Sequence, residues 1–196
     1  MKTNLLAVAV FLVIGLILVT VGVESEAEYQ LEVLESHGNA KALILFHPSR
    51  DAHFSDELSL ALADGLKTAG FSVQRATVTR STPAAPKEFA LIAVVSNTYW
   101  WTPDLPTLRY LARARLGNIP AVGIIGGAGA TERSQRMLDE ALRITGANVI
   151  QTRSFWLFRP NDEARMGEPN RQVALQMAKQ FGVSAGQSAL APSKQR

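Results

Sequence analysis

The sequence contains no cysteine, which excludes a disulfide framework, a thiolate metal site and a cysteine nucleophile. It also lacks the G-x-S-x-G turn of the α/β-hydrolases and the Walker phosphate-binding loop, the signatures of two large classes of hydrolytic enzyme. The arginines are dispersed, and neither a lysine-rich run nor a recognised nucleic-acid-binding motif accompanies them. We therefore expect no nucleic-acid partner.

Histidine is also scarce, with three in the whole chain, of which only His47 and His53 lie beyond residue 40. These two histidines share one predicted loop with Asp51, but no further convincing ligand accompanies them, so no metal site is predicted. A role for His53 as a proton donor stays open as a hypothesis.

The N-terminal segment carries no charge between residues 5 and 23, a run of 19 residues. This length is close to the roughly 20 residues that an α-helix needs to cross a hydrocarbon core, so residues 1–23 are predicted to form a single-pass membrane anchor. A cleaved signal peptide is the alternative, because residues 25–27 have the small-x-small form that a signal peptidase accepts. Lys2 is the only nearby basic side chain, and the positive-inside rule then favours a cytoplasmic N-terminus with the domain outside.

Charge is segregated along the rest of the chain. Residues 24–40 carry five glutamates and no Lys or Arg, and this segment is predicted to be an acidic linker. Residues 41–196 carry 19 Lys and Arg against 12 Asp and Glu, a net charge of +7. This basic surface is either simply solvated, or it attracts anionic lipid, a phosphate-bearing cofactor or an acidic partner.

From Lys41 onward, short apolar runs alternate with stretches of helical periodicity, a pattern typical of βαβ units around a parallel sheet. Strands are predicted over residues 41–46, 71–78, 89–95, 119–125 and 147–158, and helices over 54–70, 103–112, 131–146 and 171–181. The domain is predicted to span residues 41–182. The tail, residues 183–196, has few large apolar residues and is predicted to be disordered.

Capping residues predict where two of the helices begin. Ser55 is the predicted N-cap of the first helix in the domain, and Asp56 and Glu57 follow it, where negative charge favours the positive end of the helix. Thr102 is the predicted N-cap of the next helix, with Pro103 at the first helical position.

Five strands and about four helices predict an α/β domain of three layers, with a doubly wound five-stranded parallel sheet of order 2-1-3-4-5 after the transmembrane helix. In such a sheet a ligand binds outside the carboxyl ends of the strands, where the winding reverses. The loops after the first, third and fourth strands are expected to meet there. They contain residues 47–55, 96–103 and 126–131.

With these three loops, residues 41 to about 182 resemble the flavodoxin superfamily, including its FMN-dependent NAD(P)H and quinone reductases. In those reductases "HP" followed by a phenylalanine occurs in the first loop, as His47, Pro48 and Phe54 do here. The resemblance implies that the first loop holds the FMN phosphate, the second lays an aromatic residue against the flavin ring, and the third closes over its other side. The implied FMN-binding residues are Ser49, Arg50, His53 and Ser55, then Ser96, Asn97, Thr98, Tyr99, Trp100 and Trp101, and finally Gly126, Gly127, Ala128 and Gly129.

Two features of these loops have alternative interpretations. Trp100 and Trp101 form a stacking platform for a flat ring, pack their loop onto the next helix, or enter a lipid or partner interface. The small residues after the fourth strand either let backbone amides approach a ligand or allow a tight turn. They are not a dinucleotide fingerprint, because Glu132 occupies the position of its third glycine.

The resemblance implies a membrane-anchored protein that binds FMN and transfers electrons from NAD(P)H, or from a protein donor, to a quinone or another membrane-proximal acceptor. Such a protein is an FMN-dependent NAD(P)H oxidoreductase. The alternative is a non-catalytic flavodoxin-like module that has lost the cofactor, consistent with a first loop without glycine, and that binds a partner through its aromatic loop. No residue is assigned a catalytic role, and either function is compatible with a homo-oligomer.

Overall fold

The computed structural model describes residues 2–23, 25, 27–34, 38–48 and 53–191, with the side chains of residues 7–18 and 20 in the first helix. The strands are β1 (Leu31–Leu34), β2 (Ala40–Phe46), β3 (Phe71–Thr77), β4 (Leu91–Tyr99), β5 (Thr102–Pro103), β6 (Pro120–Gly127) and β7 (Asn148–Trp156). The helices are α1 (Lys2–Val23), α2 (Phe54–Thr68), α3 (Leu105–Arg113), α4 (Glu132–Ile144) and α5 (Asn170–Leu190), with a short 3-10 helix at Glu163–Arg165.

Parallel strands form the centre of the sheet, in the spatial order β3-β2-β4-β6-β7. Counted along the chain, this is the predicted order 2-1-3-4-5, so the doubly wound arrangement is confirmed. The winding reverses between β2 and β4, whose pairing ends at Phe46 and Val95. Two short antiparallel strands, β1 at the edge and β5 at the end of β4, bring the sheet to seven strands and were not predicted.

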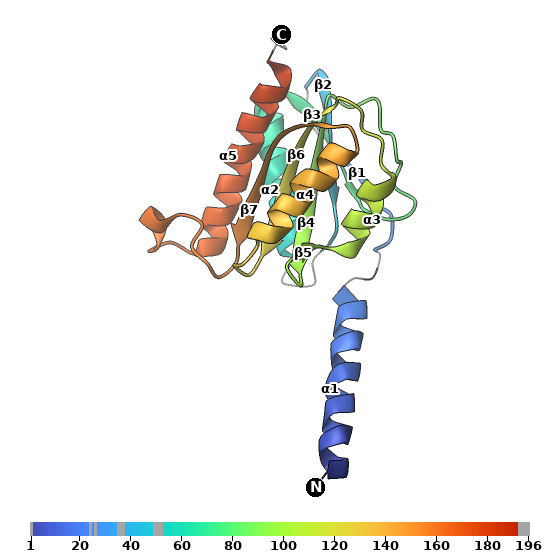
Figure 1. Ribbon diagram of the computed structural model, residues 1–196. Helices are drawn as coiled ribbons and strands as arrows, with labels where there is room; N and C mark the ends of the chain where they lie inside the picture. The colour runs from blue at the N-terminus through green and yellow to red at the C-terminus, as the bar shows by residue number, and fades with distance from the viewer. Residues whose placement is uncertain (1, 24, 26, 35–37, 49–52, 192–196) are drawn as a thin grey trace.

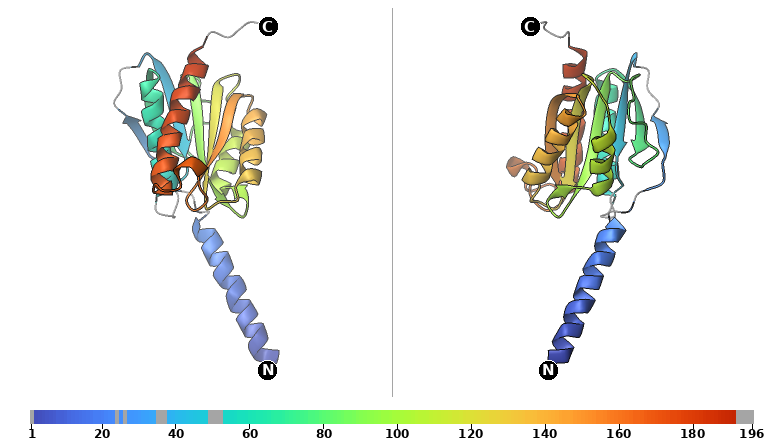
Figure 2. Two further views of the ribbon diagram at one scale, coloured as in Figure 1. Left: turned by 90° about the vertical axis from the view of Figure 1, so that its left-hand side faces the viewer. Right: turned by 45° about the vertical axis from the view of Figure 1, so that its right-hand side comes forward.

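Helices cover both faces of the sheet, which gives the predicted three layers (Figures 1 and 2). Alternate residues of β2 point to opposite sides: Ile44 packs in the core under α2 and α5, and Leu45 packs in the core under α3 and α4. Because both faces are buried, the central strands β2, β4 and β6 consist mostly of apolar residues, as in parallel sheets generally.

Helix α5 runs to Leu190, beyond residue 182, where the sequence predicts that the domain ends. Small residues allow it to pack closely on α2. A Cβ on Gly182 would lie 2.5 Å from the carbonyl oxygen of Leu62 and 3.1 Å from Cα of Gly65. Within the tail that was predicted to be disordered, residues 183–190 are helical, and a Cβ on Gly186 would lie 2.5 Å from Ala69 Cβ. Residues 192–196 lie outside the described residues.

Strand β1 lies within residues 24–40, the segment predicted to be a linker. Glu32 points to one side of β1 and binds Arg75 of β3 at 2.8 Å. Leu31 and Val33 alternate with it. A four-residue alternation among five glutamates is too weak a pattern to predict a strand, and its pairing with β3 stabilises it.

Helix α1 extends away from the sheet (Figure 1), and its described apolar side chains, such as Phe11 and Leu12, are exposed. Over the part of the chain that the structure describes, however, no helix is both long enough and apolar enough to cross a membrane. The predicted single-pass anchor over residues 1–23, its membrane contact through residues 5–23, and the membrane localisation are therefore corrected.

Candidate functional site

The three predicted loops leave the same edge of the sheet, at the carboxyl ends of β2, β4 and β6 (Figure 1). The second and third loops are already adjacent within the sheet, where Asn97 pairs with Gly126. Twelve of the predicted ligand-binding residues are described at this edge. Ser49 and Arg50 lie outside the described residues.

The backbone carbonyl of His47 joins the first loop to the second. It accepts hydrogen bonds from Ser55 Oγ at 2.8 Å and from Asn97 Nδ2 at 3.0 Å. Ser55 lies inside the first turn of α2. The prediction from the sequence that Ser55 is the N-cap is therefore wrong. The N-cap is His53, which has a left-handed backbone (φ 58°) and makes no side-chain capping hydrogen bond.

Arginines from two other elements neutralise much of the acidic charge at the start of α2. Asp56 accepts a hydrogen bond from Arg75 Nη1 of β3 at 2.6 Å, and Glu57 accepts one from Arg171 Nε of α5, also at 2.6 Å. The hydrogen bond with Glu57 is the main cause of a raised pKa for Arg171. The positive end of α2 is therefore not masked by two unpaired carboxylates.

Asp104 is a fully buried carboxylate that organises the second loop. Its Oδ2 atom accepts hydrogen bonds from Ser96 Oγ at 2.6 Å and from the Asn97 amide at 2.9 Å. Its Oδ1 atom accepts one from the Thr107 amide at 2.9 Å, which makes Asp104 the N-cap of α3. The prediction of a helix start at residues 102 and 103 is corrected, because these residues form β5. The missed signal was an N-cap aspartate two residues before a proline, a common start of a helix.

His47 lies beside Asp104 and is almost as buried. The distance from His47 Nδ1 to Asp104 Oδ1 is 3.7 Å, with side-chain exposures of 4% and 0%. His47 Nε2 lies 3.1 Å from the carbonyl oxygen of Ser25, which can only accept, so Nε2 carries a proton. Among the described residues, no group of three potential metal ligands forms here or elsewhere. His47 thus lies between the Ser25 carbonyl and the Asp104 carboxylate, and its buried Nδ1 atom makes no hydrogen bond within the described structure.

Strands β4 and β5 form a tight hairpin whose two-residue turn is Trp100-Trp101. Both residues have positive φ, 53° and 59°, as in a type I′ turn, where Asn-Gly is the usual sequence. The left-handed conformation costs a residue with a Cβ roughly 1–2 kcal/mol. These residues are 54% and 57% exposed, and Trp100 lines a shallow hollow with Leu16, Ile17 and Thr20 of α1. Strained residues of this kind cluster at functional sites.

The third loop packs tightly against the second. Gly126 and Gly127 end β6, and a Cβ on Gly127 would lie 2.7 Å from Thr131 Cγ2 and 3.3 Å from Thr98 Cβ. The hydroxyl of Thr98 is buried at this contact and has no hydrogen-bond partner. Buried polar groups are nearly always hydrogen-bonded, so this unpaired hydroxyl is an exception at the contact between the two loops.

A fourth loop, after β7, also reaches the site, and the sequence analysis missed it. The amides of Leu157 and Phe158 donate to the carbonyls of Gly127 (2.9 Å) and Ala128 (3.1 Å). The Phe158 side chain is 82% exposed. The only signal in the sequence was that the predicted fifth strand, residues 147–158, is longer than a usual strand and ends in several aromatic residues.

The same loop is anchored by Trp156 and Arg159. Trp156 Nε1 donates to Thr131 Oγ1 at 2.7 Å, and the Arg159 guanidinium lies 4.4 Å from the Trp156 ring centre. Arg159 also binds Glu132 at 2.6 Å. The pKa of Glu132 is lowered, chiefly by the hydrogen bond from its own amide and then by Arg159.

Solved structures with this arrangement are flavodoxins and related enzymes. A flavodoxin from the domain Archaea superposes with a TM-score of 0.58 at 16% identity, over 76% of this chain and 98% of that one. Flavodoxin 1 from Bacillus cereus gives 0.58 at 15%, over 74% and 97%. The fold is flavodoxin-like. An azoreductase from Bacillus anthracis gives 0.56 at 13% identity, over 74% and 99%.

No protein-family model matches the sequence, and no curated protein matches it either. At these identities the likeness concerns the fold, which confirms the flavodoxin-like architecture expected from the three loops.

Proposed function

We propose that this flavodoxin-like protein binds FMN at the carboxyl edge of the sheet and transfers electrons from NAD(P)H, or from a protein donor, to a quinone or another acceptor. The observation that carries the proposal is the exposed, strained Trp100-Trp101 turn, which lies at the end of β4 beside the unpaired hydroxyl of Thr98. FMN, when bound, supplies the one- and two-electron chemistry, and the chain binds and orients it.

The start of α2 is the proposed phosphate end of this site. Helix N-termini bind anions through free amides and the helix dipole. The pairing of Asp56 with Arg75 and of Glu57 with Arg171 removes much of the repulsion that these carboxylates would exert on a phosphate. His53 is the N-cap of α2 and is exposed, so it is the described side chain that directly precedes the proposed phosphate end of the site.

The indole rings of Trp100 and Trp101 are the proposed stacking surface for the flavin ring. Stacked aromatic pairs contribute about 0.5–1.5 kcal/mol beyond the burial of area. The close contact of Gly127 with Thr98 would hold the second and third loops together beneath this surface.

The structural neighbours support an oxidoreductase. They include an azoreductase and a WrbA-like flavodoxin from Agrobacterium tumefaciens, which gives a TM-score of 0.54 at 12% identity. The name of the azoreductase indicates reductase chemistry on this fold.

The test is a titration of the purified full-length chain with FMN, followed by tryptophan fluorescence and flavin absorbance. We expect saturable quenching, weaker binding of riboflavin because it lacks the phosphate, and bleaching of bound FMN by NADH or NADPH under anaerobic conditions. No quenching and no bound colour would reject the flavin proposal. Binding without bleaching would leave a protein donor as the source of electrons.

One observation favours a second candidate, a flavodoxin-like binding module without a cofactor. Ser55 Oγ and Asn97 Nδ2, two polar groups expected to face a flavin, both bind the His47 carbonyl. In that case the aromatic turn binds a protein partner. The FMN titration separates the two functions, because the module predicts no quenching at any FMN concentration.

A further inference from the structure

The fourth loop, residues 157–161, follows β7 at the carboxyl edge of the sheet, the edge that carries the predicted FMN-binding loops (Figure 1). It lies against three of the predicted FMN-binding residues, Gly127, Ala128 and Gly129. The carbonyls of Gly127 and Ala128 accept hydrogen bonds from amides of the fourth loop at 2.9 and 3.1 Å. A Cβ on Gly129 would lie 3.5 Å from Arg159 Cβ. The third and fourth loops are therefore in direct contact along this edge.

Asn170, the first residue of α5, fastens the fourth loop from the side opposite to the third loop's carbonyls. Its Nδ2 atom donates to the carbonyl oxygens of Trp156, Leu157 and Arg159, at 2.9, 3.0 and 2.8 Å. Its Oδ1 atom accepts from the amide and from the side chain of Asn161, both at 3.0 Å. One side chain therefore binds the fourth loop from its beginning to its end.

Asn161 closes the fourth loop on itself. Its Oδ1 atom accepts from the Trp156 amide at 2.9 Å, and its Nδ2 atom donates to the Trp156 carbonyl at 2.7 Å. The loop is thus fixed by hydrogen bonds within the chain before any ligand arrives. A binding element that is already ordered avoids the entropy cost of ordering when the ligand binds.

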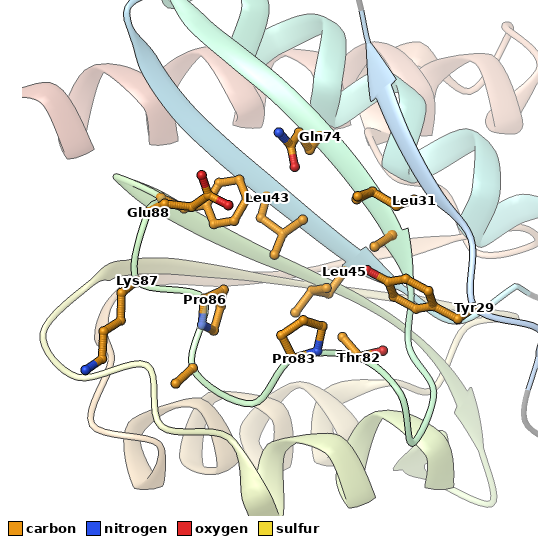
Figure 3. Close-up of a pocket in the computed structure, with 13 residues that line it drawn as sticks. Tyr29, Leu31, Leu43, Leu45, Gln74, Thr82, Pro83, Pro86, Lys87 and Glu88 are labelled. Atoms are coloured by element: carbon orange, nitrogen blue, oxygen red, sulfur yellow. The ribbon is translucent and has the colours of Figure 1, made fainter.

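The aromatic side chain of the fourth loop points into solvent, with Phe158 82% exposed. Residues 78–90 are another long connection without an α-helix, and there Phe89 packs in the core. Figure 3 shows Pro83 of that connection beside the buried Leu45. A single exposed apolar side chain is ordinary on a protein surface. Phe158 differs because a fixed loop holds it in solvent at the edge of the proposed site.

We propose that the fourth loop is an additional wall of the FMN site, with Phe158 as its ligand-contacting side chain and Asn170 as the residue that positions it. This inference rests on the proposed function. An aromatic side chain suits the flat, conjugated ring of a flavin. The hydrogen bonds of the Asn170 side chain in the described structure all end within residues 156–161, so Asn170 acts through the loop.

Replacement of Phe158 tests the contact, because so exposed a side chain contributes little to folding. The full-length chain is titrated with FMN, and flavin fluorescence gives the dissociation constant. Phe158→Ala should raise it about tenfold, since aromatic contact and ring burial are both lost. Phe158→Tyr keeps the aromatic face and should bind within about twofold of the original protein. Met166→Ala, at a 70% exposed position in the same connection, is the matched control and should leave the affinity unchanged.

Asn170→Asp tests the positioning role. A carboxylate oxygen in place of Nδ2 would face three carbonyl oxygens, so the loop is released, while negative charge in the first turn of α5 favours the helix itself. The FMN dissociation constant should rise about fivefold, because binding must then order the loop. In the Phe158→Ala background the same change should alter it by less than about twofold, because the two residues act as one unit.

Circular dichroism checks that each variant is folded. Unchanged FMN affinity in folded Phe158→Ala or Asn170→Asp would overturn the inference. Losses that multiply in the double variant would also overturn it, because Asn170 would then act independently of Phe158. If the original chain binds no FMN, the proposed function fails and the inference fails with it.

Discussion

Replacing Trp100-Trp101 with Asn-Gly separates the strain of the β4–β5 turn from its proposed role. The two positive φ angles, 53° and 59°, are the conformation that Asn-Gly prefers in a hairpin. The double variant should therefore gain about 2–3 kcal/mol from the relief of two left-handed residues. It loses whatever burial the indole rings have in the folded protein.

The lost burial can be worked out from the exposures. The rings are 54% and 57% exposed, so each buries a little under half of an area of about 200 Å². At about 25 cal/mol per Å² this is about 2 kcal/mol for each ring. That value is an upper limit, because the unfolded chain already buries some of the area. For the two rings together the loss is at most about 4 kcal/mol, against a gain of about 2–3 kcal/mol, so the free energy of unfolding should fall by no more than about 2 kcal/mol.

FMN binding should respond very differently. Loss of both aromatic faces should raise the FMN dissociation constant at least 30-fold, equivalent to about 2 kcal/mol, since stacking and ring burial both disappear. The matched control is Trp100→Phe with Trp101→Phe, which keeps two aromatic faces and the strained turn and should bind within about fivefold of the original protein. Urea denaturation measures stability, and FMN titration by flavin fluorescence measures affinity.

Two results would refute this reasoning. An unchanged FMN dissociation constant in the Asn-Gly variant would mean that the tryptophans do not contact the flavin. A loss of well over 3 kcal/mol in unfolding free energy would mean that the pair packs the hairpin and that its exposure is misleading.

Three further predictions concern stability. Asp104→Ala should lower the unfolding free energy by about 3–5 kcal/mol in urea, because it removes a helix cap and leaves buried donors unpaired, whereas Asp104→Asn should cost less than half of that; equal losses would contradict the capping role. Burial raises the pKa of Tyr110 to about 12, so its contribution is complete below pH 10 and is lost as the pH rises from 10 to 12. About 3 kcal/mol of alkaline destabilisation should be absent in Tyr110→Phe, and parallel pH curves for the two proteins would exclude this cause. Gly182→Ala should destabilise the protein by about 2 kcal/mol despite its better helix propensity, because a Cβ would lie 2.5 Å from the Leu62 carbonyl. Gly167→Ala, where a Cβ meets nothing within 4 Å, is the control, and equal thermal midpoints for the two variants would argue against close packing of α2 on α5.

The core elements of the fold could be predicted because their patterns are local. Strand β4, an unbroken apolar run, and helix α4, with Leu138 and Leu142 on one face, are readable from spacings of a few residues. Their order along the chain then restricts the sheet to a few topologies, and the site loops follow from that order.

Short or exposed elements could not be predicted in this way. The four residues of β1 depend on pairing with β3, and the two residues of β5 depend on β4. The end of α5 depends on contact between Gly182 and α2. Each of these elements is stabilised by a partner that is distant in the sequence.

The sequence by itself determined the five parallel strands, their order and the three loops that meet where the winding reverses, because alternation and helical period are properties of neighbouring residues. Only the tertiary structure decided what those loops present. It pairs Asp56 with Arg75 and Glu57 with Arg171, 19 and 114 residues apart. It also buries His47 against Asp104 and holds Trp100 and Trp101 in a strained turn. Ion pairs, burial and backbone strain depend on distances in space, and no local pattern in the sequence encodes them.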